Sequence, residues 1–300
     1  NYPDKFAIKD RLRNNTEHNS EFLDLTLKSY ELLSLLQNEK LAITESLRVN
    51  KNVSIFDHQI RAAQRIKNDF GGSALLSDEV GLGKTVEAGI IIKEFLVTSL
   101  AKKVLILAPP SLLPQWQDEM MSKFNLDFVS QKGDSRFVNV FSHDLLLMSH
   151  SSAVFPNYSE ALKDTFWDIL VVDEAHSMKN SSTRKHQLVK NLSKRHLLLL
   201  SATPVQNNLS ELYNIIDLLR PGYLGTWSQF KEKYSLDKKS RTLNPSSQKE
   251  LQDILSKVII RTTRKEVSSY IDFKNRIPHT NILEPTEKEF DLYNGISDAI

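Results

Sequence analysis

The sequence predicts an α/β fold in which a mostly parallel sheet is flanked by helices, and three observations support this prediction. Four short runs of Leu, Val and Ile show little alternation of apolar and polar residues, which is typical of parallel strands buried on both faces. Amphipathic stretches with helical periodicity lie between these runs. Each run is followed at once by a polar or turn signature. Strands and helices that alternate in this way indicate a doubly wound α/β sheet.

The expected elements follow one another along the chain. Two helices precede the sheet, at 21–36 and at 58–70, and Gly71 and Gly72 suit the end of the second one. Strands are expected at 74–76, 104–107, 169–172 and 197–200, with a further candidate at 138–141, and helices between them at 85–96, 113–124 and 183–192. After Leu209 we expect helices at 211–219 and 248–258, a mobile loop at 235–248, a short strand at 280–283 and a helix at 290–300.

Composition limits the class of protein. At about 150 residues per domain, the 300 residues suggest two domains. The 39 Lys and Arg residues against 37 Asp and Glu give a net charge of only +2, so any contact with nucleic acid has to be local. The absence of Cys excludes disulfides, thiolate metal sites and Cys nucleophiles, and it fits a reducing intracellular compartment. Because no apolar run approaches the roughly 18 residues that span a bilayer, we expect no membrane partner.

The signature after the first strand has the composition of a phosphate-binding loop. It reads Asp78-Glu79-Val80-Gly81-Leu82-Gly83-Lys84-Thr85. Gly81 and Gly83 let backbone N–H groups converge on phosphates at the N-terminus of a helix. Lys84 can then reach the β and γ oxygens, and Thr85 offers a hydroxyl to Mg²⁺. The usual pattern G-x-x-x-x-G-K-[ST] has Gly where this chain has Asp78, and the alternative is a Gly-containing turn with a surface lysine.

Two acids, Asp173 and Glu174, directly follow the strand expected at 169–172. An acid at the end of a buried strand can hold Mg²⁺, while the adjacent Glu orients and polarises the attacking water. The alternative is that Asp173 caps a helix N-terminus, which Asp also favours. Because ligands of open parallel sheets bind at the carboxyl ends of the strands, this pair is expected to share one crevice with Lys84 and Thr85.

The strand at 197–200 is followed by Ser201-Ala202-Thr203-Pro204. These residues could be no more than a polar strand end with a helix that begins at Pro. The hydroxyls of Ser201 and Thr203 are also suited to hydrogen-bond toward His176 and so to relay the phosphate state to another surface. His176 taken alone is more often a structural histidine.

Taken together, these signatures resemble the helicase superfamily-two ATPases, specifically the Swi/Snf branch of DNA-translocating motors and its compact bacterial members. The resemblance runs from about Phe56 to Tyr293 and covers the glutamine motif and motifs I, Ia, II and III. The matching stretches are Phe56-Asp57-His58-Gln59, Asp78 to Thr85, Ala108 to Trp116, Asp173 to His176 with Lys179-Asn180, and Leu200 to Asn207. Two further stretches point to this branch rather than to helicases at large: Glu211 to Pro221, and Ile260 to Val267. This branch commonly has Asp-Glu ahead of its glycines, which accounts for Asp78.

The resemblance implies a role for each matching residue. Gln59 would read the adenine edge, and Gly81, Gly83, Lys84 and Thr85 would bind the ATP phosphates and Mg²⁺. Asp173 and Glu174 would serve the metal and the water, while His176, Ser201 and Thr203 would couple hydrolysis to DNA. Motif III often reads Gly-Thr-Pro in this family where this chain has Ala202-Thr203-Pro204, and His58 stands where many members have an aromatic residue. Motifs IV to VI and the arginine fingers of a second RecA-like lobe are expected after residue 300.

One basic stretch, 177–195, is the best candidate for contact with DNA. It contains Lys179, Arg184, Lys185, Lys190, Lys194 and Arg195 and no Asp or Glu. Phosphate contacts from such residues give affinity without sequence specificity, although a solvated helix face is the usual explanation of a charge run. Our candidate DNA contacts are Ser111, Lys179, Asn180, Arg184 and Lys185. We expect Trp116 to pack in the core rather than to stack on a base. For Arg261, Arg264 and Lys265 two roles remain open: they touch DNA, or they tie the helical segment to the lobe.

We therefore expect an N-terminal helical extension at 1–50, a RecA-like ATP-binding lobe at 51–220, and a helical protrusion that returns to the lobe at 221–300. The expected function is that of the ATP-binding lobe of a motor on double-stranded DNA, with ATP and Mg²⁺ as cofactors. Without the arginines of the second lobe, the isolated chain should hydrolyse ATP poorly. The alternatives are a D-E-A-H-type RNA helicase lobe and a nucleotide-gated adaptor. We expect a cytoplasmic, nucleoid-associated monomer, or a nuclear one in a eukaryote, with RNA polymerase or another DNA-bound protein as a further candidate partner.

Overall fold

The computed structural model describes residues 41–44, 55–131, 137, 141–202, 209–235, 244–270 and 285–297. The contacts divide the chain into two units, residues 1–264 and 265–300. The helix expected at 21–36, the strand expected at 280–283, residues 138–140 of the candidate strand, most of the N-terminal extension and Thr203 lie outside the described residues.

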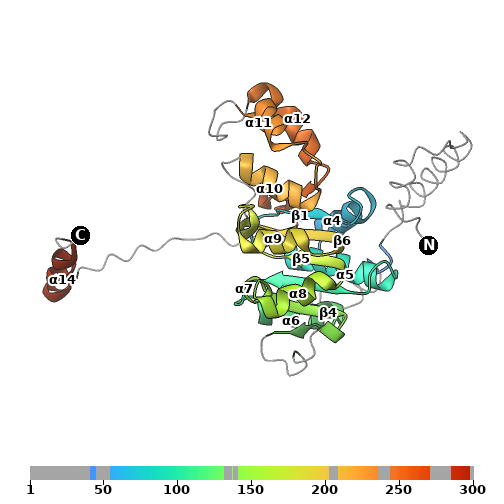
Figure 1. Ribbon diagram of the computed structural model, residues 1–300, viewed down its shortest axis with the longest axis horizontal. Helices are drawn as coiled ribbons and strands as arrows, with labels where there is room; N and C mark the ends of the chain where they lie inside the picture. The colour runs from blue at the N-terminus through green and yellow to red at the C-terminus, as the bar shows by residue number, and fades with distance from the viewer. Residues whose placement is uncertain are drawn as a thin grey trace, which may run out of the picture. The chain divides into compact units, whose positions relative to one another are not determined.

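The first unit is built on a seven-stranded sheet in which every pairing is parallel, in the order β3-β4-β2-β5-β6-β1-β7 (Figure 1). The strands are β1 (Ala74–Leu76), β2 (Val104–Ala108), β3 (Val129–Ser130), β4 (Leu145–Ser149), β5 (Trp167–Val172), β6 (Lys194–Leu200) and β7 (Ile259–Ile260). The parallel α/β prediction is confirmed, and so are the four strands that it was built on. The strands β3, β4 and β7 were not predicted.

Helices cover both faces of the sheet (Figure 1). They are α4 (Asp57–Asn68), α5 (Lys84–Val97), α6 (Leu113–Phe124), α7 (His150–Ala153), α8 (Pro156–Asp164), the short 3₁₀ helix η2 (Ala175–Met178) and α9 (Arg184–Asn191). One apolar core joins α4, α5 and α6 to strand residues such as Ile106 and Val171. A second core joins α8 and α9 to their neighbours Leu105 and Leu170, which point to the other face. Successive residues of a strand point to opposite faces, so a strand buried on both sides needs the unbroken apolar run that the sequence shows.

A helical protrusion follows the last long strand. It consists of α10 (Leu209–Leu219), α11 (Trp227–Tyr234) and α12 (Pro245–Leu255). Its own small core is formed by Leu209, Phe230, Tyr234 and Leu251. The loop expected at 235–248 is wrong at its end, because α12 already begins at Pro245. Asn244 caps this helix by accepting a hydrogen bond from the backbone N–H of Ser246 at 3.2 Å.

The chain returns from the protrusion to the sheet and adds β7 beside β1. The predicted helix 248–258 therefore ends early, and Val258 instead accepts a hydrogen bond at its carbonyl from the backbone N–H of Leu75 at 2.9 Å. A short helix, α13 (Arg264–Val267), follows, and α14 (Glu287–Ser297) lies in the second unit. Among the described residues, no helix has the length and apolar character needed to cross a membrane.

Candidate nucleotide site and DNA-facing residues

The loop between β1 and α5 has the backbone conformation of a phosphate cradle. Gly81 and Gly83 have φ angles of 89° and 86°, a region that residues with a Cβ rarely adopt. Gly83 is the N-cap of α5, so Lys84 is the first residue of the helix and Thr85 lies in its first turn. The Lys84 ammonium donates a hydrogen bond to the carbonyl of Asp78 at 2.8 Å. The lysine and the helix N-terminus thus face the same short loop, as binding of a phosphate chain requires.

Gln59, the predicted adenine reader, contacts this loop. Its amide donates to the Leu82 carbonyl at 2.9 Å and accepts from the backbone N–H of Phe56 at 3.0 Å. The side chain is buried, and a Cβ built on Gly83 would lie 2.4 Å from its nitrogen. The preceding residue of α4, His58, places Nε2 3.2 Å from the same carbonyl, to which it can only donate. The contact of Gln59 with adenine stays a prediction, while its contact with the loop backbone is observed.

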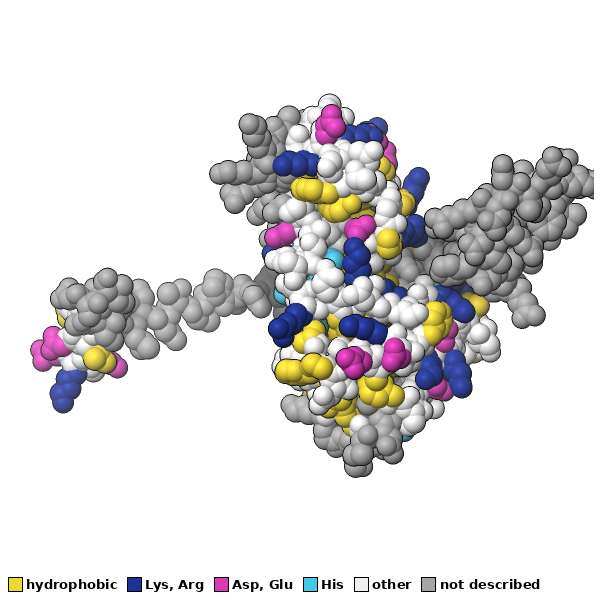
Figure 2. Space-filling view, viewed as in Figure 1, with side chains coloured by type: hydrophobic (Ala, Val, Ile, Leu, Met, Phe, Trp, Pro, Cys, Tyr) yellow, Lys and Arg dark blue, Asp and Glu magenta, His cyan; other side chains and the backbone are white. Residues whose placement is uncertain are grey.

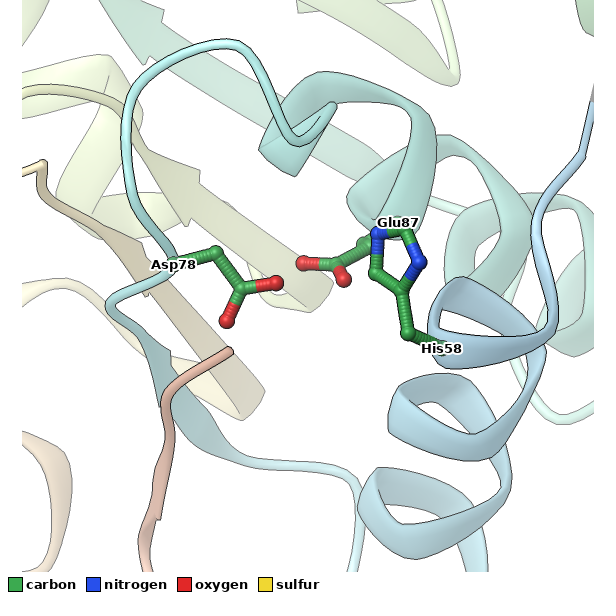
Figure 3. Close-up of side chains that lie close together, drawn as sticks. All are labelled: His58, Asp78 and Glu87. Atoms are coloured by element: carbon green, nitrogen blue, oxygen red, sulfur yellow. The ribbon is translucent and has the colours of Figure 1, made fainter. Parts of the chain in front are cut away.

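Two acids lie beneath the loop with His58 (Figure 3). One potential ligand atom from each of His58, Asp78 and Glu87 lies within 4.8 Å of the others, and all three residues are buried. One oxygen of Asp78 accepts a hydrogen bond from the Thr262 N–H at 2.7 Å. Among the described residues, the other Asp78 oxygen and both Glu87 oxygens have no donor.

The environment of Glu87 favours the neutral form of its carboxyl group. Burial raises the pKa of Glu87 well above 4.5, and the charge of Asp78 and a hydrogen bond to it raise the pKa further, while Lys84 lowers it. A proton held between the two carboxyl groups accounts for their oxygens without donors, since two adjacent buried carboxylates cannot both ionise. Such a shared proton would make the cluster a hydrogen-bonded acid pair, and a cation could bind there only by displacing it.

Asp173 directly follows β5, at the edge of the sheet where the strands have their carboxyl ends. Its carboxylate accepts hydrogen bonds from Trp116 Nε1 and from the Glu174 N–H, each at 2.8 Å. Burial raises the pKa of Asp173, and the nearby Glu174 charge adds to this, while the two hydrogen bonds and the Lys84 ammonium lower it. Because β1 and β5 are parallel strands of one sheet, the loop that holds Lys84 and the residue Asp173 follow the carboxyl ends of the strands at the same edge.

The residues around Asp173 fix its orientation. Glu174 has a φ angle of 48°, and one of its carboxylate oxygens lies 3.1 Å from Nδ1 of His176. His150 is buried and places Nε2 2.8 Å from the Asp173 carbonyl, to which it donates. Burial, chiefly, lowers the pKa of His150 to about 4, so this ring is neutral at physiological pH.

The predicted coupling residues are placed as follows. Ser201 is buried and follows β6, where its backbone N–H donates to the Leu76 carbonyl at 3.0 Å. The strand that carries motif III is thereby joined to the strand that leads into the phosphate-binding loop. His176 is exposed and interacts with Glu174 as described, and Thr203 lies outside the described residues.

The residues present fit ATP and Mg²⁺. The positive φ angles of the two glycines and the helix N-terminus suit a phosphate chain, and Lys84 supplies the cation. The Thr85 hydroxyl and the Asp173 carboxylate are the hard oxygen donors that Mg²⁺ prefers. Thr85 is half-buried and thus within reach of a ligand at the mouth of the loop.

Most of the predicted basic stretch is tied to the protein itself. Lys179 pairs with Glu211 at 3.2 Å and Lys190 with Asp217 at 3.6 Å, and both acids belong to α10. The Lys194 ammonium donates to the Val189 carbonyl at 2.7 Å and to the carbonyls of Lys190 and Leu192, and burial lowers its pKa to about 8. Lys194 therefore caps the end of α9 rather than facing a ligand.

Two basic residues of this stretch remain as candidates for phosphate contact. Neither Arg184, which is exposed, nor Lys185, which is half-buried, forms an ion pair within the described parts of the chain. Ser111 is exposed, whereas the side-chain oxygen of Asn180 accepts hydrogen bonds from Ser182. Figure 2 shows that Lys and Arg side chains on the viewed face lie scattered among Asp and Glu rather than in one large patch. Any contact with DNA from this face would thus be local.

Sequence reasoning missed four contributors to the site. Trp116 was expected in the core, and it is only 1% exposed, but its ring N–H also contacts Asp173. His150, Glu87 and Arg264 were not assigned to the nucleotide site. Trp116, His150 and Arg264 each contact a partner that is distant in sequence, so no local motif identifies them, whereas Glu87 lies only nine residues after its partner Asp78. For Arg264 the alternative of tying the segment after the protrusion to the lobe is observed, because its guanidinium donates to the Val80 carbonyl at 2.8 Å.

Comparison with known proteins adds to this geometry. The sequence matches the SNF2-related domain over residues 25–299. YqhH of Bacillus subtilis, described as an uncharacterized ATP-dependent helicase, is 35% identical over 297 residues, which cover 99% of this chain and 51% of YqhH. The RNA polymerase-associated protein RapA of Cronobacter sakazakii is 35% identical over 210 residues, which cover 65% of this chain and 22% of RapA.

Solved structures agree with these matches. The SWI2/SNF2 ATPase core of Sulfolobus solfataricus in complex with dsDNA has a TM-score of 0.63 at 29% identity, covering 73% of this chain and 46% of that one. The Sulfolobus solfataricus SWI2/SNF2 ATPase core domain has a TM-score of 0.61 at 26% identity, covering 84% of this chain and 53% of that one. This chain spans about half the length of YqhH and of these cores. The chain, which has a Gly-containing loop before α5 and an Asp-Glu pair after β5, belongs to the SNF2-related family and carries a helicase-type ATPase lobe.

Proposed function

We propose that this chain is the ATP-binding lobe of a motor that couples ATP hydrolysis to translocation along double-stranded DNA. The observation that carries the proposal is that Lys84, at the start of α5 after β1, and Asp173, directly after β5, both follow the carboxyl ends of strands of one parallel sheet. Lysine and acid on two strand ends of one parallel sheet are the two protein groups that hold a metal-bound nucleotide in this type of site.

Each residue of the site has a distinct part in this proposal. When bound, ATP supplies the phosphoanhydride bond that is hydrolysed, and Mg²⁺ neutralises negative charge on the phosphate oxygens. Lys84 and the loop N–H groups bind the phosphates, and Thr85 and Asp173 hold the metal. Glu174 orients the water, and its contact with His176 at 3.1 Å limits the directions that its carboxylate can take.

A DNA substrate is supported by the structural relative that was solved with dsDNA and by the exposed Arg184. Arg184 and Lys185 begin α9, a short distance after the Asp-Glu pair along the chain. Contacts of such residues with phosphates are independent of sequence, as a translocating motor requires, and they weaken as salt rises. RNA polymerase, with which RapA is associated by name, is a proposed partner, and a nucleoid-associated, cytoplasmic location follows from these two proposals.

The experiment compares ATP turnover of the full-length parent protein without nucleic acid, with duplex DNA and with single-stranded RNA. We expect stimulation by duplex DNA, and loss of turnover in Lys84→Ala and Glu174→Gln. Arg184→Gln combined with Lys185→Gln should raise the DNA concentration needed for half-maximal stimulation and weaken its salt dependence, with basal turnover unchanged.

The outcomes separate the proposal from its alternatives. Stronger stimulation by RNA would favour a D-E-A-H-type RNA helicase. Unchanged cellular function of the parent protein with Lys84→Ala would favour a nucleotide-gated adaptor. The isolated chain should turn over ATP about 10³ to 10⁵ times more slowly than the parent, because the arginines of a second lobe contribute an effect of this size in related systems. An isolated chain as fast as the parent would contradict the two-lobe interpretation.

A further inference from the structure

We propose that Arg264 is a positioning residue for the phosphate-binding loop, because its guanidinium holds the peptide between Val80 and Gly81 in the orientation that phosphate binding needs. The proposal deepens the proposed function and rests on ATP binding at this loop. It concerns a residue that lies far from the loop in sequence and is brought to it only by the return of the chain from the helical protrusion.

Two carbonyl groups of the loop accept hydrogen bonds from side chains outside it. The Val80 carbonyl accepts a hydrogen bond from Arg264 Nη2 at 2.8 Å, and the Leu82 carbonyl accepts one from Gln59 Nε2 at 2.9 Å. The described residues contain no cis peptide bond. In a trans peptide the N–H points away from the preceding carbonyl. The N–H groups of Gly81 and Gly83 are therefore directed away from Arg264 and Gln59, respectively.

These two N–H groups are available to a ligand. Within the described part of the chain, neither the Gly81 N–H nor the Gly83 N–H donates to a protein acceptor. The N–H of Glu79, in contrast, donates to the Thr262 carbonyl at 3.1 Å. Successive peptides turned so that their N–H groups face one side form an anion-binding concavity. Arg264 and Gln59 hold the outer sides of the two peptides concerned.

The position of Arg264 is fixed by the backbone around it. The N–H of Ser77 donates to the Ile260 carbonyl at 2.8 Å, and the Thr262 N–H donates to Asp78 at 2.7 Å. The N–H of Arg264 itself donates to the Glu79 carboxylate at 3.1 Å. A Cβ built on Gly81 would lie 3.7 Å from Arg264 Nη2, so the guanidinium lies beside this glycine.

Loss of Arg264 should therefore affect binding rather than chemistry. Without the guanidinium, the Val80 peptide can rotate, and the loop must be ordered again each time ATP binds. A hydrogen bond to a charged donor is among the stronger ones, but Arg264 is exposed and its bond is screened. We expect the KM for ATP and the Kd for ATP to rise about three- to tenfold in Arg264→Ala. The kcat at saturating ATP should stay unchanged, because Arg264 contacts the loop backbone and not the predicted metal or water residues.

The experiment uses the full-length parent protein with duplex DNA at saturation and compares Arg264→Ala, Arg264→Lys and Arg195→Ala with the wild type. Arg195 is the matched control, since it also donates to a backbone carbonyl, that of Leu100, and pairs with Asp168 at the opposite ends of the strands. The readouts are the KM and kcat for ATP, the Kd of a fluorescent ATP analogue, and the melting temperature without nucleotide. Arg264→Lys retains a donor and should recover part of the lost affinity.

The proposal is supported if KM and Kd rise together in Arg264→Ala, with kcat and melting temperature close to wild type and Arg195→Ala unaffected. Unchanged KM and Kd in Arg264→Ala would overturn it. A fall in kcat together with a lower melting temperature, without recovery in Arg264→Lys, would also overturn it, because that result shows a structural role alone. A wild-type protein that binds ATP but is not stimulated by DNA would contradict the proposed function and leave the comparison of affinities intact.

Discussion

Replacement of Glu87 by Gln should stabilise the ATPase lobe, and the gain should grow as the pH rises. Glu87 is fully buried on α5, its two oxygens have no donor among the described residues, and its neighbour is the carboxyl of Asp78. A Gln amide has nearly the same shape, can donate a hydrogen bond to Asp78 and does not titrate. The substitution thus keeps the packing and the hydrogen bond and removes only the proton equilibrium.

The size of the effect follows from the raised pKa of Glu87. In the unfolded chain this carboxyl ionises near 4.5, whereas in the folded protein its raised pKa keeps the proton bound. Between the two pKa values the folded state binds more protons, so the free energy of unfolding falls by up to about 1.4 kcal/mol per pH unit. The wild type loses this stability as the pH rises above 4.5, and the Gln variant does not. For a unit of about 250 residues, 1.4 kcal/mol corresponds to a melting-temperature difference of about 3–6 °C.

The assay is differential scanning calorimetry of the parent protein at pH 5, 6, 7 and 8, following the transition that ATP shifts. The matched control is Glu94→Gln on the same helix. Glu94 is also fully buried, but it accepts from the Lys67 ammonium at 2.7 Å and from the backbone N–H of Ala42 and of Ile43. Glu94→Gln removes the charge partner of Lys67 and should lower the melting temperature at neutral pH. A difference between Glu87→Gln and wild type that stays constant from pH 5 to 8 would mean that folding does not change the protonation of Glu87.

Two further substitutions test the loop and the metal side of the site. Gly83→Ala should lower both stability and ATP affinity, because φ is 86° and the new Cβ would meet Gln59 at 2.4 Å. The control is Gly222→Ala, where φ is 76° and no atom lies within 4 Å of the new Cβ. This control bears only the backbone strain, which is about 1–2 kcal/mol. Equal losses in melting temperature and affinity for the two variants would contradict the close contact. Trp116→Phe removes a hydrogen bond to Asp173, which is worth about 1.5–3 kcal/mol, and so raises the pKa of that acid further. The acid limb of the pH profile of kcat/KM should therefore move to higher pH, and kcat/KM at the acidic end should fall about tenfold. The control is Trp167→Phe, because the ring N–H of Trp167 donates to a backbone carbonyl instead. An acid limb that does not move in Trp116→Phe would mean that this hydrogen bond does not set the pKa of Asp173.

The sheet could be predicted from the sequence because a strand buried on both faces needs an unbroken run of apolar residues, which is visible in the sequence. Each of the four predicted strands is an unbroken apolar run, and all four lie in the middle of the sheet. The strand β4 has the same character, Leu145–Ser149, but it was assigned to no element, although the polar residues His150, Ser151 and Ser152 follow it directly. The strands β3 and β7 contain two residues each, and so short a segment has no period to recognise.

The candidate site could be predicted only as far as it is local. Lys84 and Thr85 follow their glycines directly, and Asp173 directly follows β5, so sequence order placed them at strand ends. The groups that tune these residues come from other parts of the chain. Trp116 reaches Asp173 from α6, and Arg264 reaches the loop after the whole helical protrusion. Such contacts depend on which strands become neighbours, and a single sequence does not specify that order.

The basic stretch shows why a run of one sign is a weak argument for a ligand. Its acid-free sequence suggested a surface left for phosphates, yet the neutralising acids lie in α10, where Glu211 faces Lys179 and Asp217 faces Lys190. Exposed pairs of this kind are worth little in stability, about 0–1 kcal/mol, but they lower the local positive potential that would attract DNA. Within the stretch 177–195, Arg184 and Lys185 are the cations that have neither an ion pair nor a carbonyl acceptor among the described residues, so a contact of this stretch with DNA phosphates would depend first on them. Because these ion pairs are weak, Lys179 and Lys190 can exchange the acids of α10 for phosphates at little cost. If α10 moved away, the two ammonium groups would add to the basic surface that faces DNA. Salt would weaken both the ion pairs and the phosphate contacts.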